Sequence, residues 1–157
     1  MAIRLTVNGV AHSLDVADDT PLIFVLRNDL ALHGAKLACG LEQCGACLVL
    51  ADGEPVFACS SLIGDVAGKA IETVEGLLNQ YGELHPIQEA FLSANAAQCG
   101  FCVAGIIVRA RQLLASNPNP SRDEICAALD GHLCRCGAQP RMINAIENAA
   151  ARLRGES

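Results

Sequence analysis

The chain has 157 residues, of which 52% are hydrophobic, and it carries a formal net charge of −6. This length allows one ordinary domain or two small ones. The acidic composition argues against a nucleic-acid partner, and no apolar run comes near the roughly 18 residues that suggest a membrane span. We therefore expect a folded chain that does not insert directly into a membrane.

Nine cysteines are the most informative part of the composition. In a secreted protein this number would suggest a disulfide framework, but an odd count fits disulfides poorly. Residues 1–7 lack the long apolar core of a secretory signal and show a strand pattern instead. We expect the cysteines to be reduced and to bind metal.

The first part of the chain predicts a small β-sheet. Residues 3–16 have a hairpin pattern around Asn8-Gly9, because Asn-Gly readily adopts the positive φ angles of a type I′ turn. A second hairpin is expected over residues 48–58 with Asp52-Gly53 at its turn. Residues 70–74 could add one more strand.

A short helix is expected to pack on this sheet. Thr20 is a candidate N-cap, and Pro21 follows at the first helical position, where its missing N–H costs nothing. Apolar residues then recur at helical spacing. These are Leu22, Val25, Leu26 and Leu30.

The first cysteine set has the spacing C-x4-C-x2-C, with one more cysteine after the second hairpin. This is the spacing of plant-type [2Fe–2S] ferredoxins. Its four candidate metal ligands are Cys39, Cys44, Cys47 and Cys59. Gly40 and Gly45 lie inside this segment, and glycine allows the tight backbone curvature that would aim N–H groups at cluster sulfur. We interpret this segment as a cluster-binding loop.

A second cysteine set consists of two close pairs separated by 31 residues. Its members are Cys99, Cys102, Cys134 and Cys136. Two helical patterns fill the gap between the pairs, so helices must fold back to bring the pairs together. Four thiolates suit zinc or an iron–sulfur cluster, and the ligands alone do not choose between the two. We interpret this set as one iron–sulfur site that ties a helical bundle together.

The pattern changes over residues 75–84, which contain two glycines and mixed polarity, and everything afterwards is helical. We place a domain boundary here, with a first domain over residues 1–76 and a helical domain over residues 77–157. A capping box of Ser121 and Glu124 and apolar residues at helical spacing predict four helices. These cover about residues 86–94 and 102–116, and begin at Ser121 and Pro140.

The remaining reactive residues suggest no further site. Cys126 lies outside both sets, and we expect it to pack as a small buried hydrophobic residue. The four histidines are too scattered to form a site, and His132 is not needed as a ligand beside four cysteines. Arg135, between two candidate ligands, could tune a cluster potential or serve as a surface or interface cation. No nucleophile–base pair or glycine-rich phosphate loop is visible, so we expect no catalytic residue on this chain.

With both cysteine motifs in hand, the chain resembles the small iron–sulfur subunit of the molybdenum hydroxylases, the family of xanthine, aldehyde, carbon monoxide and N-heterocycle dehydrogenases. The resemblance covers nearly the whole length. Its segments are Cys39-x4-Cys44-Gly45-Ala46-Cys47, Cys59, Thr73-Val74-Glu75-Gly76-Leu77, His85-Pro86-Ile87-Gln88, Gln98-Cys99-Gly100-Phe101-Cys102 and Cys134-Arg135-Cys136-Gly137. Within the family, residues 20–29 look most like the small subunits of nicotinate and isoquinoline dehydrogenases.

The resemblance implies an α+β chain with a plant-type ferredoxin-like β-grasp domain followed by an all-α four-helix-bundle domain, each with one [2Fe–2S] cluster. It implies that Gln98 and Cys136 contact a molybdopterin. One departure is that the stretch after Cys102 reads Val103-Ala104-Gly105, where many members have Pro-Gly. Because of this difference, the family's pterin contacts near this stretch are assigned less directly to residues of this chain.

The resemblance also implies partners. A large subunit would hold the molybdenum-pterin cofactor, as a cytosine dinucleotide, and a subunit with FAD or haem c would accept the electrons. Removal of two electrons from substrate at molybdenum requires stepwise transfer, because one [2Fe–2S] cluster accepts one electron. We expect an N-heteroaromatic substrate such as nicotinate, with aldehyde, purine or CO as alternatives. We expect the chain in the cytoplasm, or else facing a membrane or the periplasm through a partner.

Two other functions fit part of the pattern. A zinc-stabilised interaction module would use the eight thiolates for two structural ions, but the plant-type spacing and the glycines oppose it. A free-standing ferredoxin would not need the helical half, whose segment 103–108 is apolar beyond one stripe and therefore suggests deeper burial than a small bundle offers.

Overall fold

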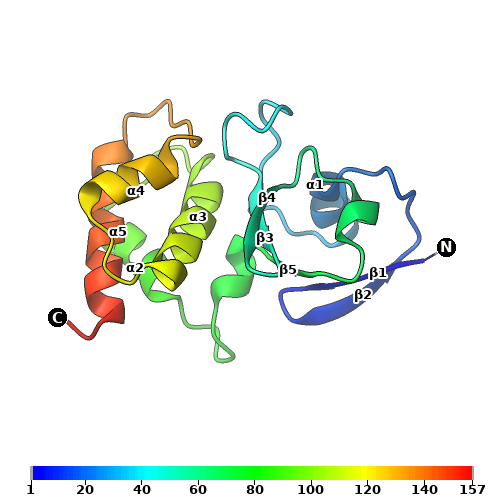
Figure 1. Ribbon diagram of the computed structural model, residues 1–157, viewed down its shortest axis with the longest axis horizontal. Coiled ribbons are helices and arrows are strands. Elements are labelled where there is room, and N and C mark those ends of the chain that lie inside the picture. The colour runs from blue at the N-terminus through cyan, green and yellow to red at the C-terminus, as the bar shows by residue number, and fades with distance from the viewer. Residues whose placement is uncertain (1, 157) are drawn as a thin grey trace.

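Figure 1 shows the computed structural model, which describes residues 2–156, with the sheet on one side of the molecule and the longer helices on the other. The strands are β1 (Ile3–Val7), β2 (Val10–Leu14), β3 (Leu48–Ala51), β4 (Glu54–Phe57) and β5 (Ala70–Glu72). They form one mixed sheet in the order β2-β1-β5-β3-β4. β1 and β5 are parallel, and all other neighbours are antiparallel. The predicted α+β fold class is confirmed.

Both predicted hairpins form around the expected turns. Asn8 and Gly9 have φ angles of 50° and 79°, and Asp52 and Gly53 have 52° and 83°. Two successive positive φ angles are the signature of a type I′ turn, whose twist matches that of the flanking strands. The turn residues therefore set the register of β1 with β2 and of β3 with β4.

The helix after the first hairpin differs from its prediction at the start. Thr20 is not the N-cap: Pro21 takes that position with ψ at 133°, and α1 spans Leu22–Phe24. Pro21 is extended because it makes an isolated β-bridge with Leu62. The chain continues as a π-helix over Val25–Asp29. The predicted apolar face is nevertheless turned into the core.

Four helices follow, as predicted. They are α2 (Pro86–Ser93), α3 (Val103–Ser116), α4 (Arg122–Leu129) and α5 (Gln139–Leu153). Ser121 and Glu124 form the expected capping box of α4. A second capping box was not foreseen: the His85 side chain accepts from the N–H of Ile87, while the Gln88 side chain accepts from the N–H of His85. Both boxes satisfy N–H groups that a helix start leaves free.

The two halves have separate cores. One core lies between the sheet and α1 and uses residues between Ile3 and Ile71, and the other joins the helices and uses residues between Leu77 and Ala150. The strand β3 links them because both of its faces are covered. Leu48 and Leu50 pack with Val108 of α3, whereas Val49 and Ala51 belong to the sheet core. The boundary between residues 76 and 77 stays a prediction.

A polar network ties the first hairpin to the segment that leads into the helices. Thr73 is 1% exposed, and its N–H donates to Asn8 Oδ1 while Asn8 Nδ2 donates to Thr73 Oγ1, both at 2.9 Å. Glu75 accepts from Thr73 Oγ1 and from the N–H of Gly34. These bonds connect three segments that are distant in the sequence.

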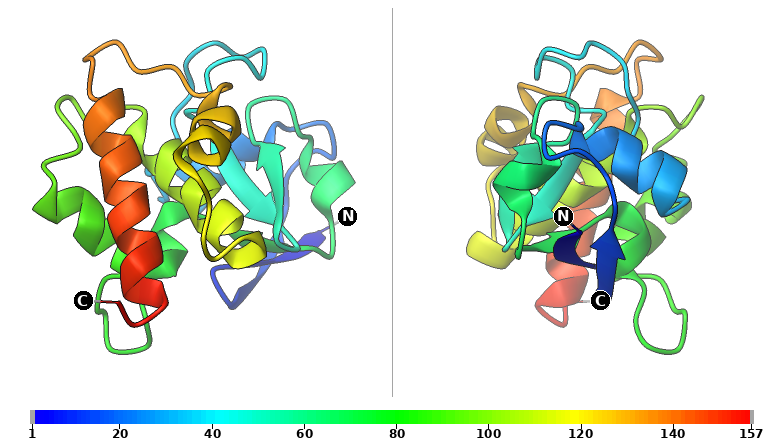
Figure 2. Two further views of the ribbon diagram at one scale, coloured as in Figure 1. Left: turned by 60° about the vertical axis from the view of Figure 1, so that its left-hand side comes forward. Right: turned by 90° about the vertical axis from the view of Figure 1, so that its right-hand side faces the viewer.

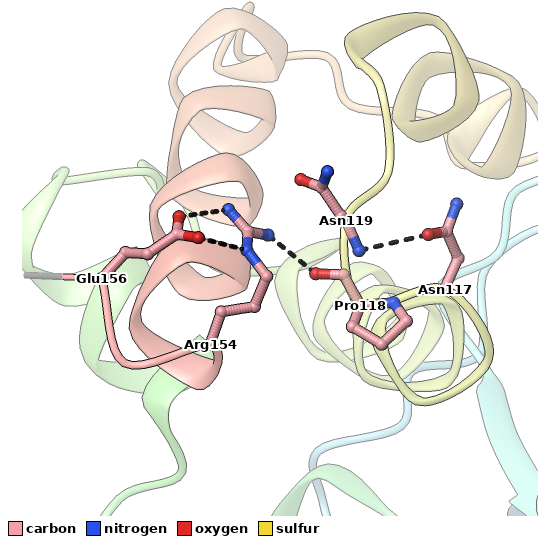
Figure 3. Close-up of polar contacts among 5 residues, drawn as sticks. All are labelled: Asn117, Pro118, Asn119, Arg154 and Glu156. Atoms are coloured by element: carbon pink, nitrogen blue, oxygen red, sulfur yellow. Dashed lines mark hydrogen bonds and ion pairs between the residues drawn. The ribbon is translucent and has the colours of Figure 1, made fainter.

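The end of α5 is held against the loop between α3 and α4 (Figure 3). Arg154 donates to the carbonyl of Pro118 at 2.8 Å and pairs with Glu156 at 2.6 Å. The N–H of Asn119 donates to Asn117 Oδ1 within the same loop. Exposed ion pairs contribute at most about 1 kcal/mol, so this contact chiefly orients the helix end.

Among residues 2–156, no helix is both long and apolar enough to cross a membrane.

Candidate metal centres

The first cysteine set lies in the loop before β3 and just after β4. In this loop Gly40 and Gly45 have φ angles of 66° and 70°, which glycine adopts without a steric penalty. The N–H groups of Leu41 and Gln43 donate to Cys39 Sγ at 3.4 and 3.3 Å. These two bonds lower the pKa of Cys39 to about 7, so the loop favours a thiolate at this position.

The second set lies at the starts of two helices. Cys102 occupies the N-cap position of α3, and Cys134 and Cys136 lie in the loop before α5. Burial alone would raise the pKa of Cys134, but N–H groups of Ala138, Cys136 and Gly137 surround its sulfur and lower the pKa. The positive ends of the α3 and α5 dipoles add to this preference for negative charge.

Gln98 joins the two segments of the second set. Its Nε2 donates to the carbonyl of Cys136 at 2.9 Å, and Gln139 Nε2 donates to the carbonyl of Cys134 at the same distance. The Gln98 side chain is exposed. It can therefore hold the second set together and still present its amide oxygen to a partner.

The sulfurs of each set are arranged in two pairs. Contacts between thiols join Cys39 to Cys44 and Cys47 to Cys59 in the first set. In the second set they join Cys102 to Cys134, and Cys99 to Cys136 at 3.4 Å. Cys44 and Cys47 are buried in the first set and Cys102 in the second, and burial raises the pKa of Cys47 and of Cys102 to about 12.

This pairing fits a binuclear cluster, in which each of two irons binds two thiolates. Four cysteines are also the usual ligand number of a [2Fe–2S] cluster. A structural zinc would instead bind four ligands around one point.

The two sets open into a common cavity. It has a volume of about 510 Å³ and is lined by Cys44 of the first set and by Cys99, Cys102 and Cys134 of the second. The loop around residue 40, in cyan, and the segment around residue 134, in orange, lie at the same end of the molecule in Figure 1 and in both views of Figure 2. The fold thus brings the two candidate centres next to each other.

His132 lies in the wall of this cavity. Burial and the nearby Arg109 lower its pKa to about 4, so the ring is neutral at physiological pH. Both ring nitrogens are buried beside the backbone of Gly105, yet neither makes a well-aligned hydrogen bond within the described chain. Spacing along the sequence did not single out this histidine.

Two further predictions, for Cys126 and Arg135, can be compared with the structure. Cys126 was expected in the core, and this was wrong: its side chain is exposed. The reason is that α4 buries Ile125, and the next residue of a helix points about 100° away from it. Arg135 is exposed and lines the shared cavity, which is compatible with both of its proposed roles.

Comparison with known proteins identifies the family. Residues 5–73 match the family described as "2Fe-2S iron-sulfur cluster binding domain", and residues 73–147 match "[2Fe-2S] binding domain". The chain is 43% identical over 148 residues to a nicotinate dehydrogenase subunit of Pseudomonas putida, covering 94% of both chains. The chain belongs to the [2Fe–2S] iron–sulfur subunits of the molybdenum hydroxylases. An isoquinoline 1-oxidoreductase subunit of Brevundimonas diminuta is likewise 43% identical, with 94% of this chain and 97% of that relative covered.

Solved structures of this family have the same fold. Quinoline 2-oxidoreductase from Pseudomonas putida 86 contains a chain that superimposes with a TM-score of 0.91 at 41% identity, covering 100% of this chain and 98% of that one. The aldehyde oxidoreductase from Desulfovibrio desulfuricans gives a TM-score of 0.94 at 41% identity, but this chain spans only 17% of it. The predicted resemblance and the predicted succession of a ferredoxin-like and a helical part are confirmed. As an iron–sulfur subunit of this family, the chain serves electron transfer in an oxidoreductase complex.

Proposed function

We propose that this chain passes electrons one at a time from a molybdopterin on the large subunit, through two [2Fe–2S] clusters, to FAD or haem c on another partner. The eight candidate ligands are Cys39, Cys44, Cys47 and Cys59 for one cluster, and Cys99, Cys102, Cys134 and Cys136 for the other. The observation that carries this proposal is the presence of two paired cysteine sets that share one cavity.

Iron analysis and low-temperature EPR of the reduced protein test the ligand assignment. We expect four irons per chain and two distinguishable signals, because the surroundings of the two sets differ and hydrogen bonds and solvent exposure tune such clusters. Cys44→Ala and Cys134→Ala should each remove one signal and leave the other. Two irons per chain in the unmodified protein would contradict the proposal, and a colourless, zinc-containing protein would favour the interaction module.

The order of the relay is proposed from the exposed amide at Gln98. The resemblance to the family assigns Gln98 and Cys136 to pterin contacts, and the Gln98 side chain is accessible while it holds Cys136. The helical-half cluster would then be nearer to molybdenum, and the loop around Glu42 would face the external acceptor. The pterin is proposed to be the cytosine dinucleotide form.

Rapid-freeze EPR of the assembled complex can follow molybdenum and both clusters separately. Gln98→Ala should slow reduction of the helical-half cluster by molybdenum, because it removes an amide proposed to touch the pterin. Glu42→Ala is the matched control in the other loop, and it should slow only delivery to the acceptor. The reverse pattern would show that the order of the two clusters is inverted.

The proposed substrate class is N-heteroaromatic, and the proposed location is the cytoplasm. The similarity to subunits of nicotinate dehydrogenase and isoquinoline 1-oxidoreductase supports this class, whereas an aldehyde oxidoreductase is 41% identical over nearly the whole of this chain. The complex purified from its native source should therefore oxidise nicotinate in preference to aldehydes, purines and CO. If the complex prefers an aldehyde, it belongs with the aldehyde oxidoreductases instead.

A further inference from the structure

A second cavity lies between the two halves of the chain, with Glu72 of β5 on one side and Arg111 of α3 on the other. Its volume of about 410 Å³ falls within the roughly 300–1,000 Å³ of small-molecule sites. The segment before α2, in green, and the end of α5 also contribute to its wall. In Figure 1 and in both views of Figure 2, these two segments lie at the end of the molecule opposite the cyan and orange cysteine loops. The cavity is therefore separate from the candidate metal centres.

The two charged residues of this cavity leave some of their hydrogen-bonding capacity unused. Arg111 Nε lies 3.6 Å from Glu72 Oε1, which is longer than a hydrogen bond. Glu72 Oε1 is buried and has no hydrogen-bond partner among residues 2–156, which is rare for a buried acceptor. Because the ion pair uses Nε, the terminal nitrogens of the guanidinium remain available to a further acceptor. The cavity thus presents an acceptor that lacks a donor beside a cation that can still bind an anion.

His85 adds a second donor next to Arg111. Its Nδ1 accepts the N–H of Ile87 at 3.2 Å. Burial and the nearby Arg111 lower the pKa of His85, so the ring is neutral at physiological pH and carries its single proton on Nε2. Since both residues line the cavity, this N–H and the guanidinium can donate to the same anionic group.

The rest of the wall is largely apolar. Leu77 and Leu114 are buried, whereas Leu153, at the end of α5, is 45% exposed and forms part of the rim with Pro118. This part of the rim is held together, because Arg154 donates to the carbonyl of Pro118 at 2.8 Å (Figure 3). An aliphatic group that enters the cavity would be shielded from water by these leucines.

We propose that this cavity binds a small α-amino acid with an aliphatic side chain. The carboxylate of the ligand accepts from Arg111 and His85, and its ammonium group donates to Glu72. The side chain of the ligand packs against Leu77 and Leu114. A carboxylate matches the planar fork of a guanidinium, but a simple carboxylic acid would place a second negative charge beside Glu72. A simple amine would leave the cationic side without an acceptor, so the zwitterion is the ligand that satisfies both sides.

Isothermal titration of the full, iron-loaded chain tests this class of ligand. The probes are L-leucine, L-isoleucine and L-valine. Two further probes are matched to L-leucine: isocaproate lacks the ammonium group, and isoamylamine lacks the carboxylate. We expect L-leucine to bind at a single site per chain and each truncated probe to bind at least about ten-fold more weakly, because each loses hydrogen bonds to a charged group.

Three variants test the location. Arg111→Gln and Glu72→Gln should each weaken the binding of L-leucine at least about ten-fold, because each removes one charge that faces the ligand. Glu72→Gln is nearly isosteric, so it remains informative if Arg111→Gln does not fold. Arg122→Gln is the matched control: Arg122 pairs with Glu147 at 2.9 Å, and it does not line the cavity. Circular dichroism and iron content verify the folding of every variant.

Three results would overturn the inference. One is that none of the three amino acids binds, and another is that isocaproate binds as tightly as L-leucine. The third is that Arg122→Gln weakens binding as much as Arg111→Gln and Glu72→Gln do. The inference does not depend on the cysteine ligands, so these results leave the proposed electron transfer unaffected.

Discussion

Replacing Gly45 by alanine should destabilise the protein in two separable ways. The first is conformational: Gly45 has a φ of 70°, and an L-residue in the left-handed region costs about 1–2 kcal/mol. The second is steric, because the new Cβ would lie 2.4 Å from the His132 ring, and overpacking typically costs about 1–3 kcal/mol. The total of about 2–5 kcal/mol is a large share of the roughly 5–15 kcal/mol that stabilises a typical domain.

Gly40→Ala is a control in the same loop. Gly40 also has a positive φ, of 66°, but a Cβ there meets nothing within 4 Å. It should therefore cost only the conformational part. Urea unfolding of the iron-loaded proteins, followed by circular dichroism with iron content measured in parallel, gives both free-energy changes.

A double variant isolates the steric part. His132→Ala introduced together with Gly45→Ala removes the ring that the new Cβ would meet, so the coupling between the two substitutions should be favourable. Equal losses for Gly40→Ala and Gly45→Ala, or no coupling in the double variant, would refute the reasoning.

Three further predictions concern other parts of the chain. Asn8→Ala should lower the urea-unfolding free energy by about 1–3 kcal/mol, because the buried N–H of Thr73 loses its acceptor. Burial lowers the pKa of His85 below 6.5, so the unfolded chain binds a proton at a higher pH than the folded chain does, and the stability that His85 contributes is lost as pH falls below about 6.5. The fall in melting temperature between pH 7.5 and 5.5 should therefore be smaller for His85→Asn, a variant whose side chain can still accept the N–H of Ile87 and cap α2. Cys126→Ala should retain all iron, because this exposed side chain belongs to neither cysteine set, and loss of iron would show a misassigned ligand.

Much of the fold could be predicted because its signals are local. The Asn8-Gly9 pair needs only its own φ preferences to specify a hairpin, and Ser121 with Glu124 is complete within four residues. The two cysteine sets were likewise recognisable from spacing. At the start of the first helix the prediction failed because a distant residue decided the outcome. Pro21 is drawn into an extended conformation by Leu62, which moved the start of α1 away from Thr20.

The close contact between the two halves of the chain, where Gly105 of α3 lies against the backbone of the first cysteine loop, could not be predicted from the sequence. Gly105 offered one signal, since an isolated glycine in an apolar helical run often has a packing reason. Its partner, however, is the carbonyl of Gly45, sixty residues earlier in the chain. His132 carried no signal, because a histidine next to a metal motif has no distinctive pattern of its own. Such contacts follow from how the two halves dock, and docking is not encoded in any single segment.

The position of β5 in the sheet bears on how the protein is assembled during synthesis. On the proposed ligand assignment, every ligand of the first cluster has been translated once Cys59 is made. The sheet, however, remains split into two hairpins until β5 enters between β1 and β3. The second cluster must wait longer still, for Cys136 just before α5. The ligands of the two centres are therefore synthesised in sequence, and all four of the first are present before any residue of helices α2 to α5 has been translated.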